Sequence, residues 1–156
     1  MKKFELTNEF ITNMFGTKLF RIRALVEFGD VEAGELGGYV EKESNLGHDD
    51  NAWVYDNARV YGNARVYGDA RVCGNGDYAY AHGFGSVNRT TTFFRLKDGG
   101  VGVRCGCFYG TLAQFRDKIR ETHGESAIAE EYLDLAALME KRFRRTGNEQ
   151  KTEEES

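Results

Sequence analysis

A six-residue phrase is repeated almost without change from Asn51 onwards, as NAWVYD, NARVYG, NARVYG and DARVCG. This repeat constrains the fold most, because a fixed period imposes the same backbone path on every copy. A period of six fits neither an amphipathic helix nor the alternation of one strand. The recurring apolar residues are Ala52, Val54, Ala58, Val60, Ala64, Val66, Ala70 and Val72. Because the Asn, Asp and Gly between them accept left-handed backbone angles at low cost, the sequence predicts a β-solenoid that points Ala and Val inward.

The pattern continues upstream in a weaker form through Val40, Ser44 and Leu46, within the segment LGGYVEKESNL. Together with the four copies, this segment resembles the hexapeptide pattern of left-handed β-helices, in which three short flats make one triangular coil. It is also similar to small phage and prophage hexapeptide proteins, often labelled acyltransferases, over residues 18–83. The resemblance implies a short left-handed β-helix and, for acyltransferases, a trimer with a catalytic histidine beside a coenzyme A groove.

Four segments are expected along the chain, whose 156 residues suit one compact unit or two very small ones. Residues 1–35 are expected to form N-terminal strands or a cap, and residues 36–87 the hexapeptide β-helix. Residues 88–145 are expected to form a β-hairpin and two helices, and the polar residues 146–156 a disordered tail. The predicted fold class is therefore mainly β with α: a short left-handed β-helix followed by a β-hairpin and two C-terminal helices.

The hairpin is predicted from two β runs around Asp98-Gly99, a dipeptide typical of a tight turn. If these two residues are the turn, one face of the hairpin is apolar enough to be core. Its pairs are Leu96 with Val101, Phe94 with Val103 and Thr92 with Cys105. The opposite face carries Phe93, Arg95, Arg104 and Phe108, with the bare backbone of Gly102 and Gly106 between them.

Two helices are predicted after the hairpin. Thr111 and Gln114 are spaced as a capping box at the start of the first helix, and Gly124 is placed to end it. Ser126 is expected to begin the second helix. The apolar stripes of the two helices comprise Leu112, Phe115, Ile119, Ile128, Tyr132, Leu135 and Met139.

Composition excludes several classes of protein. A formal net charge of −4 argues against general nucleic-acid binding, which needs a basic excess. No apolar run approaches the length of a membrane span, and MKKFELTNEF lacks the apolar core of a signal peptide. Three cysteines do not form an even disulfide framework, so a cytoplasmic location is expected, in the host cell if the protein is phage-encoded.

Catalytic and metal-binding interpretations are both weak. An acyltransferase would need His48 or His82, but neither lies in a motif that supports this role, and the coils are too few for a cofactor groove. Cys105 and Cys107 are too close in sequence for a good tetrahedral zinc chelate. We therefore expect turn or surface histidines, buried cysteines that act as small hydrophobic residues, and no catalytic residue, metal or cofactor.

The candidate ligand site is the second face of the hairpin, with Phe93, Arg95, Arg104, Phe108 and Thr111. Aromatic rings stack on nucleobases, and guanidinium groups hold phosphate in a bidentate manner. The helix that starts after Thr111 adds free amides and a positive dipole end. The same face could instead pack on the body or on a second subunit, with its arginines paired to acidic residues.

The function expected from these features is non-enzymatic binding by a phage-encoded, self-associating protein. It would counteract host defence by sequestering a nucleotide-like signal, or by blocking a defence protein through Trp53, Tyr55 and Tyr61. Self-association is expected because the repeat body is short and the last helix is rich in apolar residues. The alternatives are a trimeric hexapeptide acyltransferase and a structural assembly protein.

Overall fold

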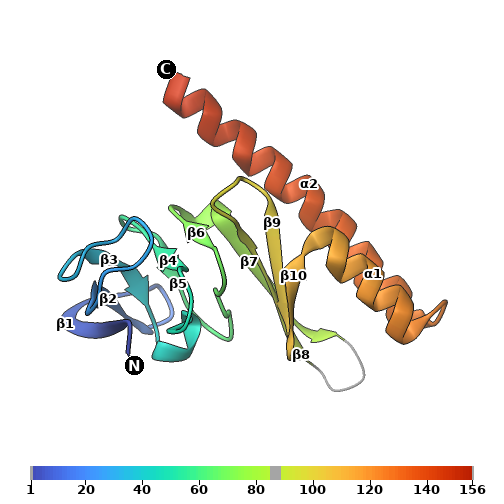
Figure 1. Ribbon diagram of the computed structural model, residues 1–156, viewed down its shortest axis with the longest axis horizontal. Helices are drawn as coiled ribbons and strands as arrows, with labels where there is room; N and C mark the ends of the chain where they lie inside the picture. Colours follow the sequence, from blue (N-terminus) through green and yellow to red (C-terminus); the bar gives the residue numbers. More distant parts are fainter. Residues whose placement is uncertain (1, 85–88, 156) are drawn as a thin grey trace. The chain divides into compact units, whose positions relative to one another are not determined.

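The computed structural model describes residues 2–84 and 89–155, with side chains for all of these except residues 75 and 148–155. The chain divides into two compact units, Met1–Asn75 and Gly76–Ser156. Each unit is built around its own β-sheets (Figure 1). The strand at 78–84, expected within the hexapeptide segment, belongs to the second unit.

The first unit begins with a β-hairpin of β1 (Phe4–Thr12) and β2 (Lys18–Ala24). Strand β3 (Leu36–Val40) pairs antiparallel with β2, and the short β5 (Arg59–Val60) pairs parallel with β3. A separate two-stranded parallel sheet joins β4 (Trp53–Val54) to β6 (Arg71–Val72). A short 3₁₀ helix, η1 (Glu43–Asn45), precedes an isolated parallel bridge between Leu46 and Val66.

The prediction of a left-handed β-helix is wrong, although the coarser class, mainly β with α, agrees with the structure. The described repeat residues do not form one closed or solenoid sheet, because their short strands are divided between two separate sheets. Each of β4, β5 and β6 has only two residues. In addition, the N-terminal hairpin extends the sheet of β3 by antiparallel pairing, which a coil of parallel flats does not contain.

The inward orientation of the repeat is confirmed. All four valines and all four alanines of the hexapeptides are buried. Three positions six residues apart, Asp56, Gly62 and Gly68, have positive φ angles of 54°, 67° and 70°. The left-handed turns expected at the Asp and Gly corners therefore form, and they direct each Val into the interior.

Two adjacent glycines let β3 lie against the repeat segment. A Cβ on Gly38 would lie 2.5 Å from the carbonyl oxygen of Ala58, and one on Gly37 would lie 2.6 Å from that of Val54. Both distances are well inside van der Waals contact. The Gly-Gly pair of LGGYV is therefore required by close backbone approach.

The N-terminus of the first unit is anchored by a buried lysine. Lys3 is 3% exposed, and its Nζ donates to the carbonyl oxygens of Asp50 (3.0 Å) and Ala52 (2.6 Å). It also forms an ion pair of 3.2 Å with the Asp50 carboxylate and lies 4.6 Å from the centre of the Phe28 ring. Burial lowers the pKa of Lys3, whereas the Asp50 charge raises it.

The neutral imidazole of His48 packs against the start of β1. Its ring is stacked on Phe4 at 4.3 Å, and its Nδ1 accepts the backbone N–H of Lys3 at 3.1 Å. Burial, followed by the nearby charges of Lys3 and Lys2, lowers the pKa of His48, and Glu43 opposes this shift. A protonated ring would have to give up the hydrogen bond, because both of its nitrogens are then donors.

We expect the protein to lose stability as the pH falls below 6.5, the ordinary pKa of histidine. The folded state binds the His48 proton less tightly than the unfolded chain does. Neutral His48 therefore stabilises the folded state fully above pH 6.5. This stabilisation is lost as the pH falls through the lower pKa that His48 has in the folded state. Denaturant unfolding over this pH range measures the effect. The His48→Asn side chain keeps a hydrogen-bond acceptor but does not titrate, so this variant should lose less stability as the pH falls. An equal loss of stability in the variant and the wild-type protein would contradict the assignment of the pH dependence to His48.

The second unit is a four-stranded antiparallel sheet with two helices on one face (Figure 1). Its strands lie in the order β10-β9-β8-β7. After η2 (Asn75–Asp77), which spans the boundary between the two units, the elements are β7 (Tyr78–Phe84), β8 (Arg89–Arg95), β9 (Val101–Cys105), β10 (Phe108–Thr111), α1 (Leu112–His123) and α2 (Ala127–Glu155). Apolar residues of β8 and β9 form one core with both helices, centred on Phe93, Val103 and Phe115.

The hairpin forms, but its register differs by one residue from the prediction. The Leu96 N–H donates to the Gly100 carbonyl, so the loop has three residues, with Gly99 at a φ of 91°. Arg95 therefore pairs with Val101, and Phe93 with Val103. A slip of one residue moves every side chain of β8 to the opposite face.

The helix boundaries agree with the predicted capping. The Thr111 hydroxyl accepts the Gln114 N–H at 3.2 Å, and the Gln114 side chain accepts the Thr111 N–H at 2.9 Å. Gly124 ends α1 at a φ of 58°, and the Ser126 hydroxyl accepts the Ala129 N–H at 3.2 Å. Residues 146–155, expected to belong to a disordered tail, are part of α2, which continues to Glu155.

Candidate functional site

The five predicted ligand-binding residues do not share one face of the hairpin. In the observed register, Phe93 and Arg95 lie on the face that the helices cover. Arg104 lies opposite Thr92 and Tyr109 in the neighbouring strands, on the other face of the sheet. The structure therefore separates the two arginines that were expected to hold one anion.

Arg95 is engaged in a buried network within the second unit. Its Nε donates to the Asp77 carboxylate at 2.8 Å, and its Nη2 donates to the Phe143 carbonyl at 3.0 Å and to Thr146 Oγ1 at 2.9 Å. Its guanidinium carbon also lies 5.3 Å from the centre of the Phe143 ring. Arg95 thus joins β8 to α2, as in the alternative in which the arginines pair with acidic residues.

The other predicted residues have different environments. Phe93 is fully buried, with its ring edge-on to Phe115 at 6.0 Å. Phe108 is half-buried on the same side of the sheet, 5.8 Å from the Phe115 ring. Thr111 is exposed, and its hydroxyl caps α1. Of the five, only Phe108 lines the pocket described below.

Several other candidate residues have structural roles. Trp53 is 1% exposed, so it is not available for the proposed blocking surface, whereas Tyr61 is exposed. His48 is stacked on Phe4, and His82 Nδ1 lies 2.7 Å from the Thr90 hydroxyl. The structure shows three free cysteines: Cys105 is buried as expected, Cys107 is exposed, contrary to the expectation that it shares the core face with Cys105, and Cys73 is also exposed.

The apolar residues of the last helix lie mainly inside their own unit. Leu135, Met139 and Phe143 belong to the core, and Leu138 is exposed. The helix therefore supports self-association less than its sequence suggested.

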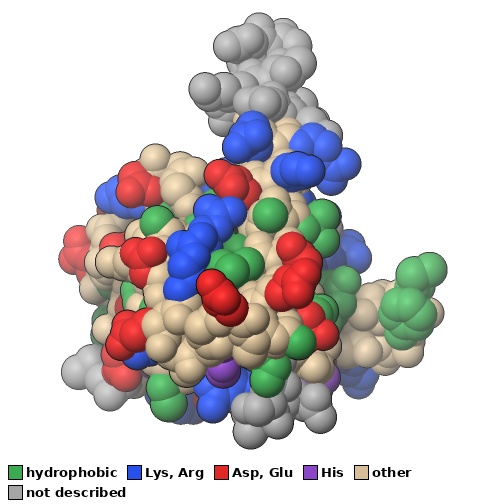
Figure 2. Space-filling view, turned by 90° about the vertical axis from the view of Figure 1, so that its right-hand side faces the viewer, with side chains coloured by type: hydrophobic (Ala, Val, Ile, Leu, Met, Phe, Trp, Pro, Cys, Tyr) green, Lys and Arg blue, Asp and Glu red, His purple; other side chains and the backbone are tan. Residues whose placement is uncertain are grey.

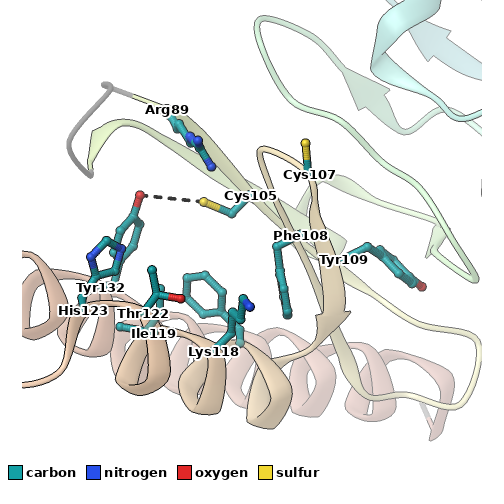
Figure 3. A pocket seen from close by; sticks show the side chains of 11 residues that line it. Arg89, Cys105, Cys107, Phe108, Tyr109, Lys118, Ile119, Thr122, His123 and Tyr132 are labelled. Carbon is teal, nitrogen blue, oxygen red and sulfur yellow. Dashed lines mark hydrogen bonds between the residues drawn. The ribbon is translucent and has the colours of Figure 1, made fainter.

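A pocket of about 600 Å³ lies in the second unit, between the β9–β10 turn and the two helices (Figure 3). The lining residues are Arg89, Cys105, Cys107, Phe108, Tyr109, Phe115, Lys118, Ile119, Thr122, His123 and Tyr132. Phe108 points toward α1, whereas Tyr109 points away from the cavity (Figure 3). Most of the lining is therefore contributed by one side of the sheet and by α1.

Exposure and charge change from the inner end of the pocket to its mouth. Phe115, Ile119 and Tyr132 are buried, whereas Arg89 and Lys118 are exposed. None of the described lining residues is acidic. The pocket thus has aromatic and aliphatic inner walls and a basic mouth.

Gly106 lies in the turn next to the pocket residues Cys105 and Cys107. Its φ is 60° in the two-residue β9–β10 turn, a conformation that favours glycine. A Cβ at this position would also collide with the Arg89 guanidinium. Glycine therefore permits both the turn and the position of the Arg89 head group above it.

A buried hydrogen-bonded chain lies at the inner end of the pocket. The Thr91 hydroxyl donates to Cys105 Sγ at 3.3 Å, and the Cys105 thiol donates to the Tyr132 hydroxyl oxygen at 3.8 Å (Figure 3). Burial, reinforced by Cys105, raises the pKa of Tyr132 to about 12. Tyr132 is therefore a neutral phenol at physiological pH.

Charge elsewhere in this unit is not concentrated at the pocket. Basic side chains gather on α2 next to its grey C-terminal residues (Figure 2). Lys141 and Arg144 lie in this part of α2, and Arg144 is 3.6 Å from Glu140, which also pairs with Arg116 at 2.7 Å. These residues do not line the pocket and therefore offer matched controls for substitutions within it.

Sequence reasoning missed the pocket because of the register. Arg89 alternates with Thr91 and Phe93, which places all three on one face of β8. Likewise Phe115, Ile119 and His123 recur every four residues along α1. Both patterns can be read from the sequence. Only the observed strand register places this face of β8 opposite this side of α1.

Comparison of the chain with protein-family models, curated proteins and solved structures finds no match in any of the three. Among the described residues, no helix has the length and apolar character needed to cross a membrane. Nor do the described residues contain a group of three or more His, Cys, Asp or Glu side chains suited to a metal ion.

Proposed function

We propose that the protein is a non-enzymatic binding protein that sequesters a nucleotide-like anionic small molecule in the pocket between α1 and the β9–β10 turn. The supporting observation is the combination of aromatic inner walls, a basic mouth and a lining without acidic residues. A volume of about 600 Å³ is in the range of small-molecule sites. Phe108 and Phe115 offer rings for stacking, and Arg89 offers a bidentate phosphate donor.

The biological setting remains that expected from the resemblance: a phage-encoded protein that removes a nucleotide signal of host defence. The free cysteines favour a reducing cytoplasm. Sequestration requires tight binding without turnover, for which a rigid pocket is sufficient. Self-association, blocking of a defence protein, acyl transfer and structural assembly remain predictions without a supporting contact in this pocket.

Removing either cation at the mouth should weaken nucleotide binding by roughly tenfold or more, because hydrogen bonds to charged groups contribute about 1.5–3 kcal/mol. The variants are Arg89→Gln and Lys118→Gln, titrated by calorimetry with the four common ribonucleoside monophosphates. Lys141→Gln removes the same charge on α2 outside the pocket and should leave the dissociation constant unchanged.

Arg104→Gln distinguishes this pocket from the site expected from sequence. Arg104 lies on the other face of the sheet, so its replacement should not affect binding in the pocket. Loss of binding in Arg104→Gln, with normal binding in Arg89→Gln and Lys118→Gln, would contradict the proposal. Absence of nucleotide binding to the wild-type protein, together with no anionic small molecule released from it on denaturation, would also contradict it.

A further inference from the structure

We propose that the loop between β1 and β2 inserts into the surface of a phospholipid bilayer, with Met14 and Phe15 among the lipid chains and Lys18 at an anionic headgroup. The tip is defined as residues 13–17, which join the two strands of the N-terminal hairpin. This inference goes beyond the proposed function and does not depend on it, because residues of the second unit line the pocket.

The tip presents two adjacent apolar side chains to solvent. Met14 is 89% exposed, and Phe15 is 84% exposed. No other large apolar residue among those with described side chains is more than 58% exposed. The two side chains therefore add nothing to the core of their own unit. Contiguous exposed apolar surface of this kind marks a contact with another protein or with a membrane.

The backbone of the tip is hydrogen-bonded within the tip itself. The Asn13 side-chain oxygen accepts the N–H groups of Phe15 and Thr17, both at 3.0 Å. The Asn13 N–H donates to the Thr17 carbonyl, and the Gly16 N–H donates to the Asn13 carbonyl, again at 3.0 Å. An unsatisfied backbone group costs free energy when it leaves water for lipid. These four amides keep their partners on insertion, so the tip is suited to an apolar surrounding.

The charge of the hairpin end suits an anionic lipid surface. From Phe10 to Phe20 the sequence FITNMFGTKLF contains one cation, Lys18, and no acidic residue. Lys18 is exposed, and its Nζ lies 4.7 Å from the centre of the Phe10 ring. The acidic residue before this segment, Glu9, forms an ion pair with Arg21 at 3.0 Å. The hairpin end therefore combines an apolar tip with a cation behind it.

A lipid surface fits this tip better than the surface of a second protein does. One large side chain buries about 150–250 Å², so Met14 and Phe15 supply less than the roughly 800 Å² that each partner gives to a stable protein interface. Binding to a bilayer needs no matching surface and increases with the buried apolar area and the attraction to anionic lipids. The satisfied amides, the charge and the small apolar area therefore favour the same occupant.

The test measures binding of the full chain to vesicles by co-sedimentation. The vesicles contain phosphatidylcholine alone or an equal mixture of phosphatidylcholine and phosphatidylglycerol. Phe15→Ala should weaken binding to the mixed vesicles by roughly tenfold or more, because burial of the ring is lost. Lys18→Gln should weaken it by about fivefold, and only when phosphatidylglycerol is present. Leu138→Ala removes another exposed apolar side chain, on α2, and should leave binding unchanged.

Fluorescence of a second variant shows which part of the chain enters the lipid. Phe15→Trp keeps an aromatic ring at the tip, and its emission should shift to shorter wavelength when mixed vesicles are added. Wild-type protein has one tryptophan, Trp53, which is already buried and should show no such shift. Vesicle binding by Phe15→Trp without the shift would overturn the proposal.

The other outcomes are equally decisive. If wild-type protein binds neither vesicle, the proposal is overturned. Equal binding by wild type and Phe15→Ala also overturns it, because another surface then holds the lipid. Self-association that Phe15→Ala abolishes, without vesicle binding, would assign the tip to a second copy of the chain instead. Should Phe15→Ala not fold, the emission shift of Phe15→Trp decides the question.

Discussion

Replacing Arg95 by methionine should lower the free energy of unfolding by about 3–5 kcal/mol, the usual cost of removing one member of a buried ion pair. Asp77 is 1% exposed, and without the guanidinium its carboxylate loses a partner at 2.8 Å. The Phe143 carbonyl and the Thr146 hydroxyl lose donors in the same step. Chemical denaturation of the full chain, followed by circular dichroism, measures the loss.

Two further variants identify the cause. Arg95→Met combined with Asp77→Asn removes the buried negative charge and should recover part of the lost stability. Arg120→Met removes an exposed arginine from α1, whose ion pair with Asp117 is long at 3.7 Å, and should change stability by less than about 0.5 kcal/mol. If Arg95→Met is as stable as wild type, Arg95 is not the link between β8 and α2 that the structure shows.

Replacing Lys3 by methionine should lower the free energy of unfolding by about 3 kcal/mol or more. Methionine matches the length and apolar stem of lysine, so the change isolates the charged head group. The Ala52 and Asp50 carbonyls lose their buried donor, and the Asp50 carboxylate loses its cation. Asp50 still accepts the Gly68 N–H at 2.7 Å, which keeps the carboxylate in place.

The neighbouring lysine provides the control. Lys2 is joined to Glu43 by an ion pair of 2.9 Å, but both side chains are largely exposed, so Lys2→Met should cost less than about 1 kcal/mol. Equal decreases in the free energy of unfolding for Lys2→Met and Lys3→Met would show that stability depends on positive charge near the N-terminus in general. The structure instead predicts dependence on the buried position of Lys3.

Local features of the fold followed from the sequence. Burial of the hexapeptide Val and Ala residues was predictable, because their spacing repeats while the residues between them are turn formers. The left-handed angles at Asp56, Gly62 and Gly68 follow from the same spacing. The capping box of Thr111 and Gln114 was equally clear, since both groups lie within one helical turn. Each of these features depends on residues close together in the chain.

The candidate ligand site shows what the local sequence pattern does not determine. Asp98-Gly99 indicated a hairpin but did not show whether the loop has two residues or three. The hydrogen bond between Leu96 and Gly100 decides this, and the resulting shift moves Phe93 and Arg95 to the helix side of the sheet. Tyr132, more than 25 residues beyond Cys105, meets it only after both helices fold back on the sheet.

The chain's own pattern thus determined which residues turn, which are buried and where the helices begin. Tertiary structure decided how the strands combine into sheets and which side chains meet in the pocket. The physical reason is that turn geometry and helix capping involve neighbouring groups, whereas strand pairing depends on competition among distant segments. Here β3 pairs with the N-terminal hairpin on one side and with β5 on the other, so the repeat strands belong to two separate sheets in place of one coil.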